Sequence, residues 1–147
     1  MILDTLTLLS DDQDLSQAAG TYYSDIYNLL GDAGYTTSND APSGVAKDMG
    51  KGTPKDFFCR VSQTFTSGGA ATLVATLQTS ADNSTYVDVI VSKTFALAEL
   101  VAGADLLPQR LPHGLLQYTK VKYVIGTATT TAGTVTCGIG SALQSNG

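Results

Sequence analysis

Apolar and polar side chains alternate along much of the chain, which is the pattern of β-strands that turn one face toward a core. The clearest case is segment 57–65, where Phe57, Cys59, Val61 and Phe65 share one face and polar side chains occupy the other. The same pattern predicts further strands at 71–79, 86–95, 118–125 and 134–143, with additional candidates at 2–9 and 24–30. Seven or eight short strands are therefore expected.

Two of these predicted strands carry side chains that bear on function. In segment 86–95, Val87, Val89 and Val91 are predicted to face the same way. In segment 118–125, Lys120 and Lys122 alternate with apolar residues, so the face that carries them is expected to meet water or a partner. Neither pattern by itself identifies the partner.

Signals for helix are weak. Segment 96–102 predicts either one or two helical turns that end at Gly103 or a strand end that folds into a bend. Segment 10–19 predicts a short helix with Ser10 as its N-cap. Glycine, serine, threonine and asparagine mark the connections. They predict a hairpin at 66–69, a turn at 80–84, a threonine-rich loop at 126–133 and a long surface excursion at 31–52.

Many short strands with almost no helix predict one all-β domain over residues 1–147, built as a sandwich or a barrel. A chain of 147 residues can bury a core without metals or disulfides. Charged residues make up only 14% of it, a low share that suits half-buried strands better than solvent-facing helices.

The charge distribution restricts the partners. The net charge is −5, which argues against nucleic-acid binding because phosphate neutralisation needs clustered lysine and arginine. No basic residue precedes Lys47, whereas seven aspartates do. Such asymmetry is typical of a solvated face, or of charge complementarity with a partner or a second copy. No apolar run is long enough to cross a bilayer and the start lacks a basic leader pattern, so we expect synthesis in the cytoplasm.

Candidate catalytic and ligand-binding motifs are incomplete. His113 is the one histidine, and one histidine with two distant cysteines does not supply a zinc site. Segment 50–53 (GKGT) lacks the spacing and the following helix of a phosphate-binding loop. Asp82 and Asn83 supply too few ligands for calcium, and Glu99 is the only glutamate. We therefore predict no enzyme activity, no metal and no cofactor.

The two cysteines, Cys59 and Cys137, both fall in predicted strands. In a reducing compartment they are expected to be small buried apolar residues, with a disulfide between them as the alternative.

Seven segments resemble, in the same order, those of a known family, and together they span nearly the whole chain. They are 1–4 (MILD), 47–54 (KDMGKGTP), 77–83 (LQTSADN), 96–103 (ALAELVAG), 111–114 (LPHG), 118–123 (YTKVKY) and 132–138 (AGTVTCG). The family is that of the jelly-roll capsid cement, or decoration, proteins of tailed bacteriophages, typified by a cement protein of a Bordetella phage. Segment 22–43 is longer than the family norm, which leaves its contacts open.

The resemblance implies a jelly-roll-like β-sandwich of about eight antiparallel strands. It also implies a structural virion protein on the outside of an icosahedral head, where it staples neighbouring major capsid subunits of HK97-like fold. The expected partners are that capsid protein and a second copy of the chain, with a homodimer favoured and a trimer as the other option.

Two regions are predicted to contact the capsid or another subunit. The first is an N-terminal strand or arm, residues 1–9, which includes Ile2, Leu3, Asp4 and Leu6 and could add to a partner's sheet edge. The second is a basic group, which consists of Lys47, Lys51 and Lys55. For each region the alternative is an ordinary solvated surface.

A second class of function stays open, a phage tail, receptor-binding or carbohydrate-binding β-sandwich module. Sugar-binding platforms expose aromatic side chains, and four tyrosines cluster near the start of the chain: Tyr22, Tyr23, Tyr27 and Tyr35. The chain has no tryptophan, which disfavours this function.

Overall fold

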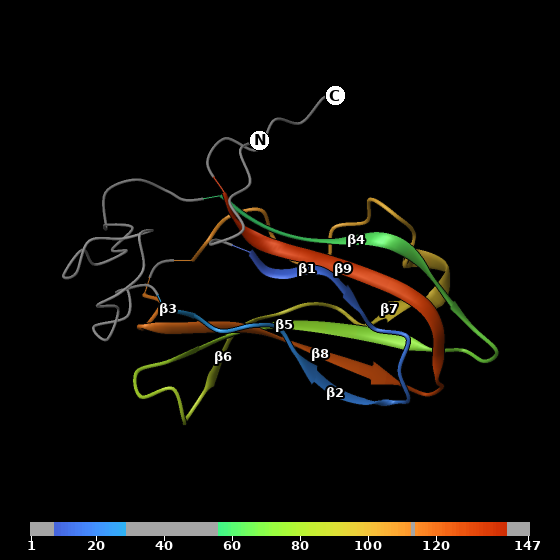
Figure 1. The fold of residues 1–147 in the computed structure, drawn as a ribbon, viewed down its shortest axis with the longest axis horizontal. Helices are drawn as coiled ribbons and strands as arrows, with labels where there is room; N and C mark the ends of the chain where they lie inside the picture. The colour runs from blue at the N-terminus through green and yellow to red at the C-terminus, as the bar shows by residue number, and fades with distance from the viewer. Residues whose placement is uncertain (1–7, 29–55, 113, 141–147) are drawn as a thin grey trace, which may run out of the picture.

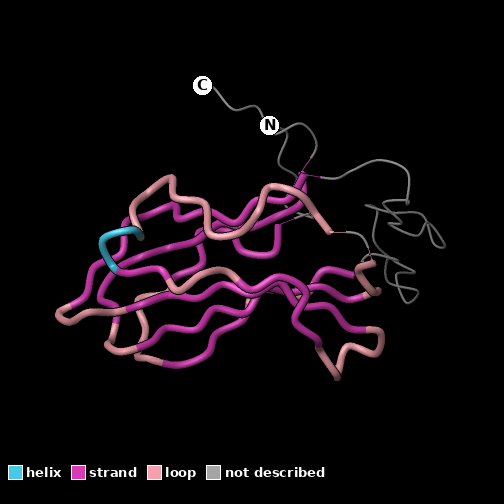
Figure 2. Tube along the Cα trace, turned by 180° about the vertical axis from the view of Figure 1, so that it is seen from behind, coloured by secondary structure: helices cyan, strands magenta, loops and turns pink. Residues whose placement is uncertain are grey.

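The computed structural model describes residues 8–28, 56–112 and 114–140. In these residues nine strands and a single 3-10 turn form two layers (Figure 1). The elements are β1 (Leu8–Asp14), β2 (Gly20–Tyr23), β3 (Tyr27–Asn28), β4 (Asp56–Ser67), β5 (Thr72–Ser80), β6 (Val87–Val91), β7 (Phe95–Ala96), η2 (Leu97–Glu99), β8 (Tyr118–Gly126) and β9 (Thr130–Gly140). Figure 2 shows helix in the described part only at the short η2 turn.

The strands make two antiparallel sheets that pack face to face. The smaller sheet has the order β1-β9-β4, and the larger has the order β2-β8-β5-β6. Two short strands extend the larger sheet, because β3 also pairs with β8 and β7 also pairs with β5. The predicted all-β sandwich with little helix is thus confirmed.

The chain repeatedly crosses from one sheet to the other, as in a jelly roll. It does so between β1 and β2, β3 and β4, β4 and β5, and β8 and β9. Segment 100–110 lies along the free side of β4, where two isolated bridges join Asp56 to Arg110 and Arg60 to Asp105. With that segment as the fourth member of the smaller sheet, the strand order is that of a jelly roll.

The core lies between the two sheets and follows the predicted alternation. From the smaller sheet, Phe57, Cys59, Val61 and Phe65 are all buried, as are Val135, Cys137 and Ile139. From the larger sheet, the buried residues are Leu73, Ala75, Leu77, Val121, Tyr123 and Ile125. Burial of these side chains is the main favourable contribution to folding.

Gly133 allows a close contact inside the smaller sheet. Its φ is +139°, and a Cβ at this position would lie 2.4 Å from the ring of Phe65. Phe65 itself is almost fully buried. Glycine at residue 133 therefore lets the phenyl ring pack directly on the backbone of β9.

Three local predictions were wrong. Segment 66–69 is no hairpin, because β4 pairs with β9 while β5 pairs with β8, so this connection crosses between the sheets. Segment 10–19 is not helical, since residues as far as Asp14 form β1 and pair with β9. Within segment 126–133, β8 extends to Gly126 and β9 begins at Thr130, so only residues 127–129 connect them. In each case pairing with a distant strand overrides the local signal.

Candidate interaction surface

One edge of the smaller sheet is sealed by segment 100–110. The backbone N–H groups of Val61 and Phe65 donate to the carbonyl oxygens of Ala104 and Leu100, both at 2.9 Å. Leu106 donates in turn to the carbonyl oxygen of Cys59 at 2.8 Å. The side chains of Leu100, Leu106 and Leu107 anchor the segment because they are buried in the core. No further strand can therefore pair with β4 without displacing this segment.

The β6 side of the larger sheet has no such cover within the described residues. β6 ends the order of that sheet, and its three valines are exposed: Val87 by 53%, Val89 by 37% and Val91 by 58%. Exposed edge strands normally carry lysine, proline or other charges that prevent pairing. The one charged residue of β6 is Asp88, and its carboxylate is paired with Lys122.

The three valines were predicted to share one face of β6, and this prediction was wrong. Leu77 pairs with Ile90 and Gln78 with Asp88, so Val89 is the extra residue of a β-bulge. Ile90 packs against the core, and the valines stay at the rim. A bulge and a length of five residues both limit strand addition at an edge. This edge therefore presents exposed valine side chains rather than a long open ladder of backbone groups.

The opposite side of the same sheet also exposes apolar side chains. Tyr23 at the end of β2 and Ile26 just before β3 are each 49% exposed. Of the seven large exposed apolar residues in the described part, five lie on these two sides of the larger sheet. We call the two regions the β6 edge (Val87, Val89 and Val91) and the β2–β3 edge (Tyr23 and Ile26).

A lysine held between two aromatic rings connects the two edges across the outer face of the larger sheet. The ammonium of Lys120 lies 4.1 Å from the ring centre of Tyr23 and 3.8 Å from that of Tyr86. Burial, followed by the nearby charge of Lys122, lowers the pKa of Lys120. Cation–π contacts of this kind contribute about 0.5–2 kcal/mol each. The contact stiffens the sheet between its two apolar edges.

A second polar group on this face surrounds Asp88. The Gln78 side-chain amide donates to the Asp88 carboxylate at 2.6 Å, and the Lys122 ammonium lies 3.3 Å from it. The Gln78 hydrogen bond and then Lys122 lower the pKa of Asp88. Beneath these side chains Thr76, Gln78 and Ser80 are buried, although they lie on the outward side of β5. The sequence did not predict this burial, because it depends on side chains from β6 and β8.

Two tight corners hold β6 in place. Before it, the Asp82 carboxylate accepts hydrogen bonds from the backbone N–H of Thr85 at 2.8 Å and of Ser84 at 2.9 Å. These bonds, with one from the Ser80 hydroxyl, lower the pKa of Asp82 to about 2. The predicted turn at 80–84 is confirmed, and the Asp82 carboxylate is engaged by hydrogen bonds within it.

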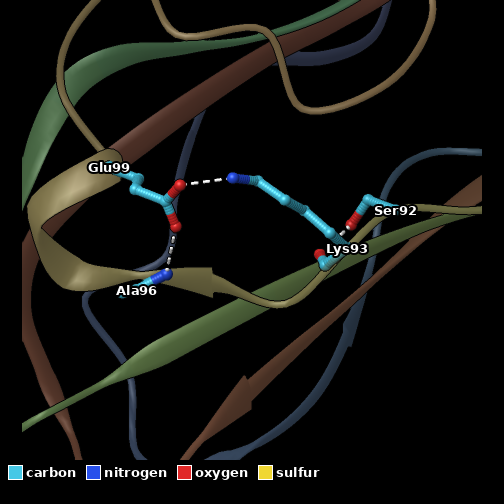
Figure 3. Close-up of polar contacts among 4 residues, drawn as sticks. All are labelled: Ser92, Lys93, Ala96 and Glu99. Carbon is cyan, nitrogen blue, oxygen red and sulfur yellow. Dashed lines mark hydrogen bonds and ion pairs between the residues drawn. The ribbon is translucent and has the colours of Figure 1, made fainter.

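The corner after β6 joins it to η2 (Figure 3). The Glu99 carboxylate forms an ion pair with Lys93 and accepts a hydrogen bond from the Ala96 backbone N–H at 3.0 Å. The Ser92 backbone N–H and hydroxyl both contact Ala75, which ties the corner to β5. The predicted helical turn at 96–102 is confirmed as the single turn η2, and Gly103 follows it with φ of +92°.

A small polar cluster lies inside the core. The Tyr123 hydroxyl, from the larger sheet, is 3.0 Å from the Ser10 hydroxyl and 3.8 Å from the Cys59 sulfur, both from the smaller sheet. Burial, and then proximity to Cys59 and Cys137, raises the pKa of Tyr123 far above its ordinary value. The cluster bridges the two layers and fixes how they face each other.

The residues predicted as capsid or subunit contacts lie outside the described residues. This holds for Ile2, Leu3, Asp4 and Leu6 of the arm, for Lys47, Lys51 and Lys55, for the excursion 31–52 and for His113. These predictions stay predictions. Sequence reasoning missed the β6 edge, because a valine-rich strand pattern does not show whether the strand lies at the edge of a sheet.

The three described tyrosines near the start do not form an aromatic platform, and Tyr35 lies outside the described residues. Tyr27 is buried, Tyr22 packs against the core, and only Tyr23 of the described three is well exposed, where it stacks on Lys120. In residues 8–28, 56–112 and 114–140, no group of three or more potential metal ligands comes together. No helix in this described part has the length and hydropathy that a membrane span requires.

The described residues define a small all-β protein of the jelly-roll class. One of its sheet edges is sealed by segment 100–110, and two others carry exposed apolar side chains. The chain belongs to the Bbp16 family, whose model matches residues 35–139, well over half of the chain. This family is phage-related and is named after a Bordetella phage protein. Among curated proteins, none matches the chain.

Proposed function

We propose that this protein is a cement protein of a phage head, which binds the outside of the capsid and holds neighbouring major capsid subunits together. The observation that carries this proposal is the position of the exposed apolar residues at two edges of one sheet. A rigid body with two such edges can contact two neighbours at once. Membership of a phage-related family supports the same role.

The physical requirements of a cement protein agree with this arrangement. Packaged DNA pushes the shell outward, and a clip that buries surface on two subunits opposes their separation. Each contact can be weak, because a shell presents many equivalent sites in register and the contacts act multivalently. The Lys120 contact across the larger sheet and the Tyr123 cluster between the layers limit bending of the clip.

The proposal retains the partners that the sequence predicted. The partners are the HK97-like major capsid protein and a second copy of the chain, with the arm and the three lysines Lys47, Lys51 and Lys55 as additional contacts. The β6 edge and the β2–β3 edge supply the apolar part of the contact. A charge placed on either edge should therefore weaken attachment without unfolding the protein.

The proposal is tested by adding purified protein to capsids that lack it and measuring occupancy by co-sedimentation. We expect Val91→Lys on the β6 edge and Ile26→Lys on the β2–β3 edge each to weaken binding about tenfold, which corresponds to about 1.4 kcal/mol. The double variant should bind more weakly than either single variant.

Val101→Lys is the matched control. Val101 is 49% exposed, close to the exposure of Ile26 and Val91, but it lies on the segment that seals the smaller sheet. We expect it to bind like the unmodified protein. Wild-type protein that fails to bind the shell, or all three variants binding equally well, would contradict the proposal.

A further inference from the structure

The two cysteines lie directly opposite each other in the smaller sheet. Cys59 of β4 and Cys137 of β9 are Cα partners in the antiparallel register, and both side chains are completely buried in the core. Both thiols are free. Burial, and then a hydrogen bond with the Cys59 thiol, raises the pKa of Cys137, so the two sulfur atoms are close neighbours.

The hydrogen bonds of β4 show which kind of antiparallel pair this is. The carbonyl oxygen of Cys59 accepts from Leu106 at 2.8 Å, and Val61 donates to Ala104, so these residues direct their backbone groups toward the sealing segment. They therefore point away from β9. Cys59 and Cys137 form a non-hydrogen-bonded pair, in which Cα atoms lie about 4.5 Å apart and side chains approach most closely.

This separation is compatible with a covalent link. Disulfides span Cα distances of about 4.4–6.8 Å, and the expected distance falls at the short end of that range. The β4–β9 backbone already holds the two cysteines in register, so the closed bond fits the pairing of the two strands as it stands.

We propose that Cys59 and Cys137 are a latent cross-strand disulfide, which is reduced after synthesis and closes under oxidising conditions to stabilise the folded chain. The oxidant is a small-molecule disulfide. A Cys59 or Cys137 thiolate attacks it and forms a mixed disulfide, and the second cysteine displaces the remaining thiol. One sulfur–sulfur bond is exchanged for another, and the reagent leaves as two thiols that carry the two protons.

Burial determines when this reaction occurs. Both sulfurs lie in the core between the two sheets and are inaccessible there, so the exchange requires local opening between the two layers and is expected to be slow. The closed bond restricts the unfolded chain over a loop of about 80 residues, which is where a disulfide stabilises most. This step rests on the proposed function. The Cys59–Cys137 disulfide would close after the particle has left the host cell, because the cytosol is reducing and the surroundings of a free particle are not.

The experiment oxidises the folded, purified protein with an excess of oxidised glutathione. We expect an intact mass lower by about 2 Da. Peptide mapping without reductant should recover one peptide pair that joins residues 59 and 137. The melting temperature should rise by roughly 5–15 °C and should return to its starting value after reduction.

Two controls distinguish a specific disulfide between Cys59 and Cys137 from general oxidation of the protein. Cys137→Ala and, should it not fold, Cys59→Ala are each compared with their own untreated form and should show no rise in melting temperature. Urea-unfolded wild type shows that the reagent is active. A bond that forms only in urea, a bond between two copies, or an oxidised protein that melts no higher than the reduced one would overturn the proposal.

The same chemistry can be followed on particles. Cysteines alkylated at lysis should be free, and those of stored particles should be linked. Because the first experiment uses the isolated chain, it can succeed when no particle carries the protein, and it can fail when the protein does coat the shell. Failure of the inference and failure of the proposed function are thereby distinguished.

Discussion

The two sheets of this protein treat their edges in opposite ways. Beside β4, segment 100–110 occupies the backbone hydrogen-bonding groups and inserts three leucines into the core. Beside β6, the described residues offer no such cover, and three valines remain exposed. Segment 100–110 thus closes the β4 edge of the smaller sheet, whereas the β6 edge of the larger sheet stays apolar and exposed. On the proposed function, the β6 edge is the one that a partner covers, because exposed apolar edges otherwise promote aggregation.

The largest effect is expected from damage to the sealed edge. Leu100 is fully buried, and its carbonyl oxygen accepts the N–H of Phe65. Leu100→Ala should lower the free energy of unfolding by roughly 2–5 kcal/mol through the lost apolar contact and the remaining cavity. Urea denaturation measures the loss, and faster amide hydrogen exchange at Phe65 would show that the segment opens.

Val91→Ala is the corresponding change on the open edge. Its side chain is more than half exposed, so the free energy of unfolding should change by no more than about 0.5 kcal/mol. Equal losses for the two alanine variants would contradict the distinction between a sealed and an open edge.

A smaller effect is expected from the charge next to the β6 edge. In Lys122→Gln, Asp88 loses its ion pair but keeps the hydrogen bond from Gln78. Because both charges are partly exposed, stability should fall by less than about 1 kcal/mol. The pKa of Asp88 should rise toward its ordinary value, which NMR titration can measure, and capsid occupancy should decrease. An unchanged Asp88 pKa would show that Lys122 does not neutralise it.

The smallest effect concerns the turn that leads into β6. The pKa of Asp82 is held at about 2, below the ordinary aspartate value of 3.8, by hydrogen bonds from Thr85, Ser84 and Ser80. A carboxyl with a lowered pKa stabilises the folded state above its unfolded pKa, and this contribution disappears as the pH falls through the folded value. We expect the turn to persist at pH 4 and to loosen toward pH 2. A carboxyl carbon titration of Asp82 with a midpoint near 3.8 would refute this.

The alternation of side chains predicted the core well, because periodicity reports the face that a strand buries. Most of the buried residues of β4, β8 and β9 were in the predicted phase, for example Val61, Val121 and Val135, whereas Phe58 of β4 is buried out of that phase. Periodicity does not report the sheet to which a strand belongs. The crossing at 66–69 therefore looked like a hairpin, and the first residues of β1 after Ser10 looked like a helix.

The interaction surface was harder to predict than the core. The order of strands decides which of them lies at an edge, and this order depends on long-range pairing. The bulge at Val89 changed the direction of its neighbours, and the burial of Gln78 depends on Asp88 and Lys122 from other strands. The capsid contacts predicted at Ile2 and Lys47 lie in residues that the structure does not describe, so they remain predictions.

The most direct test is a cryo-electron microscopy reconstruction of the particle that carries this protein, at a resolution that separates its two sheets. We predict copies over the whole outer surface of the head, with the β6 edge or the β2–β3 edge buried against a neighbouring subunit and segment 100–110 facing solvent. A shell without the protein, or copies attached through segment 100–110 with both apolar edges in solvent, would contradict the account.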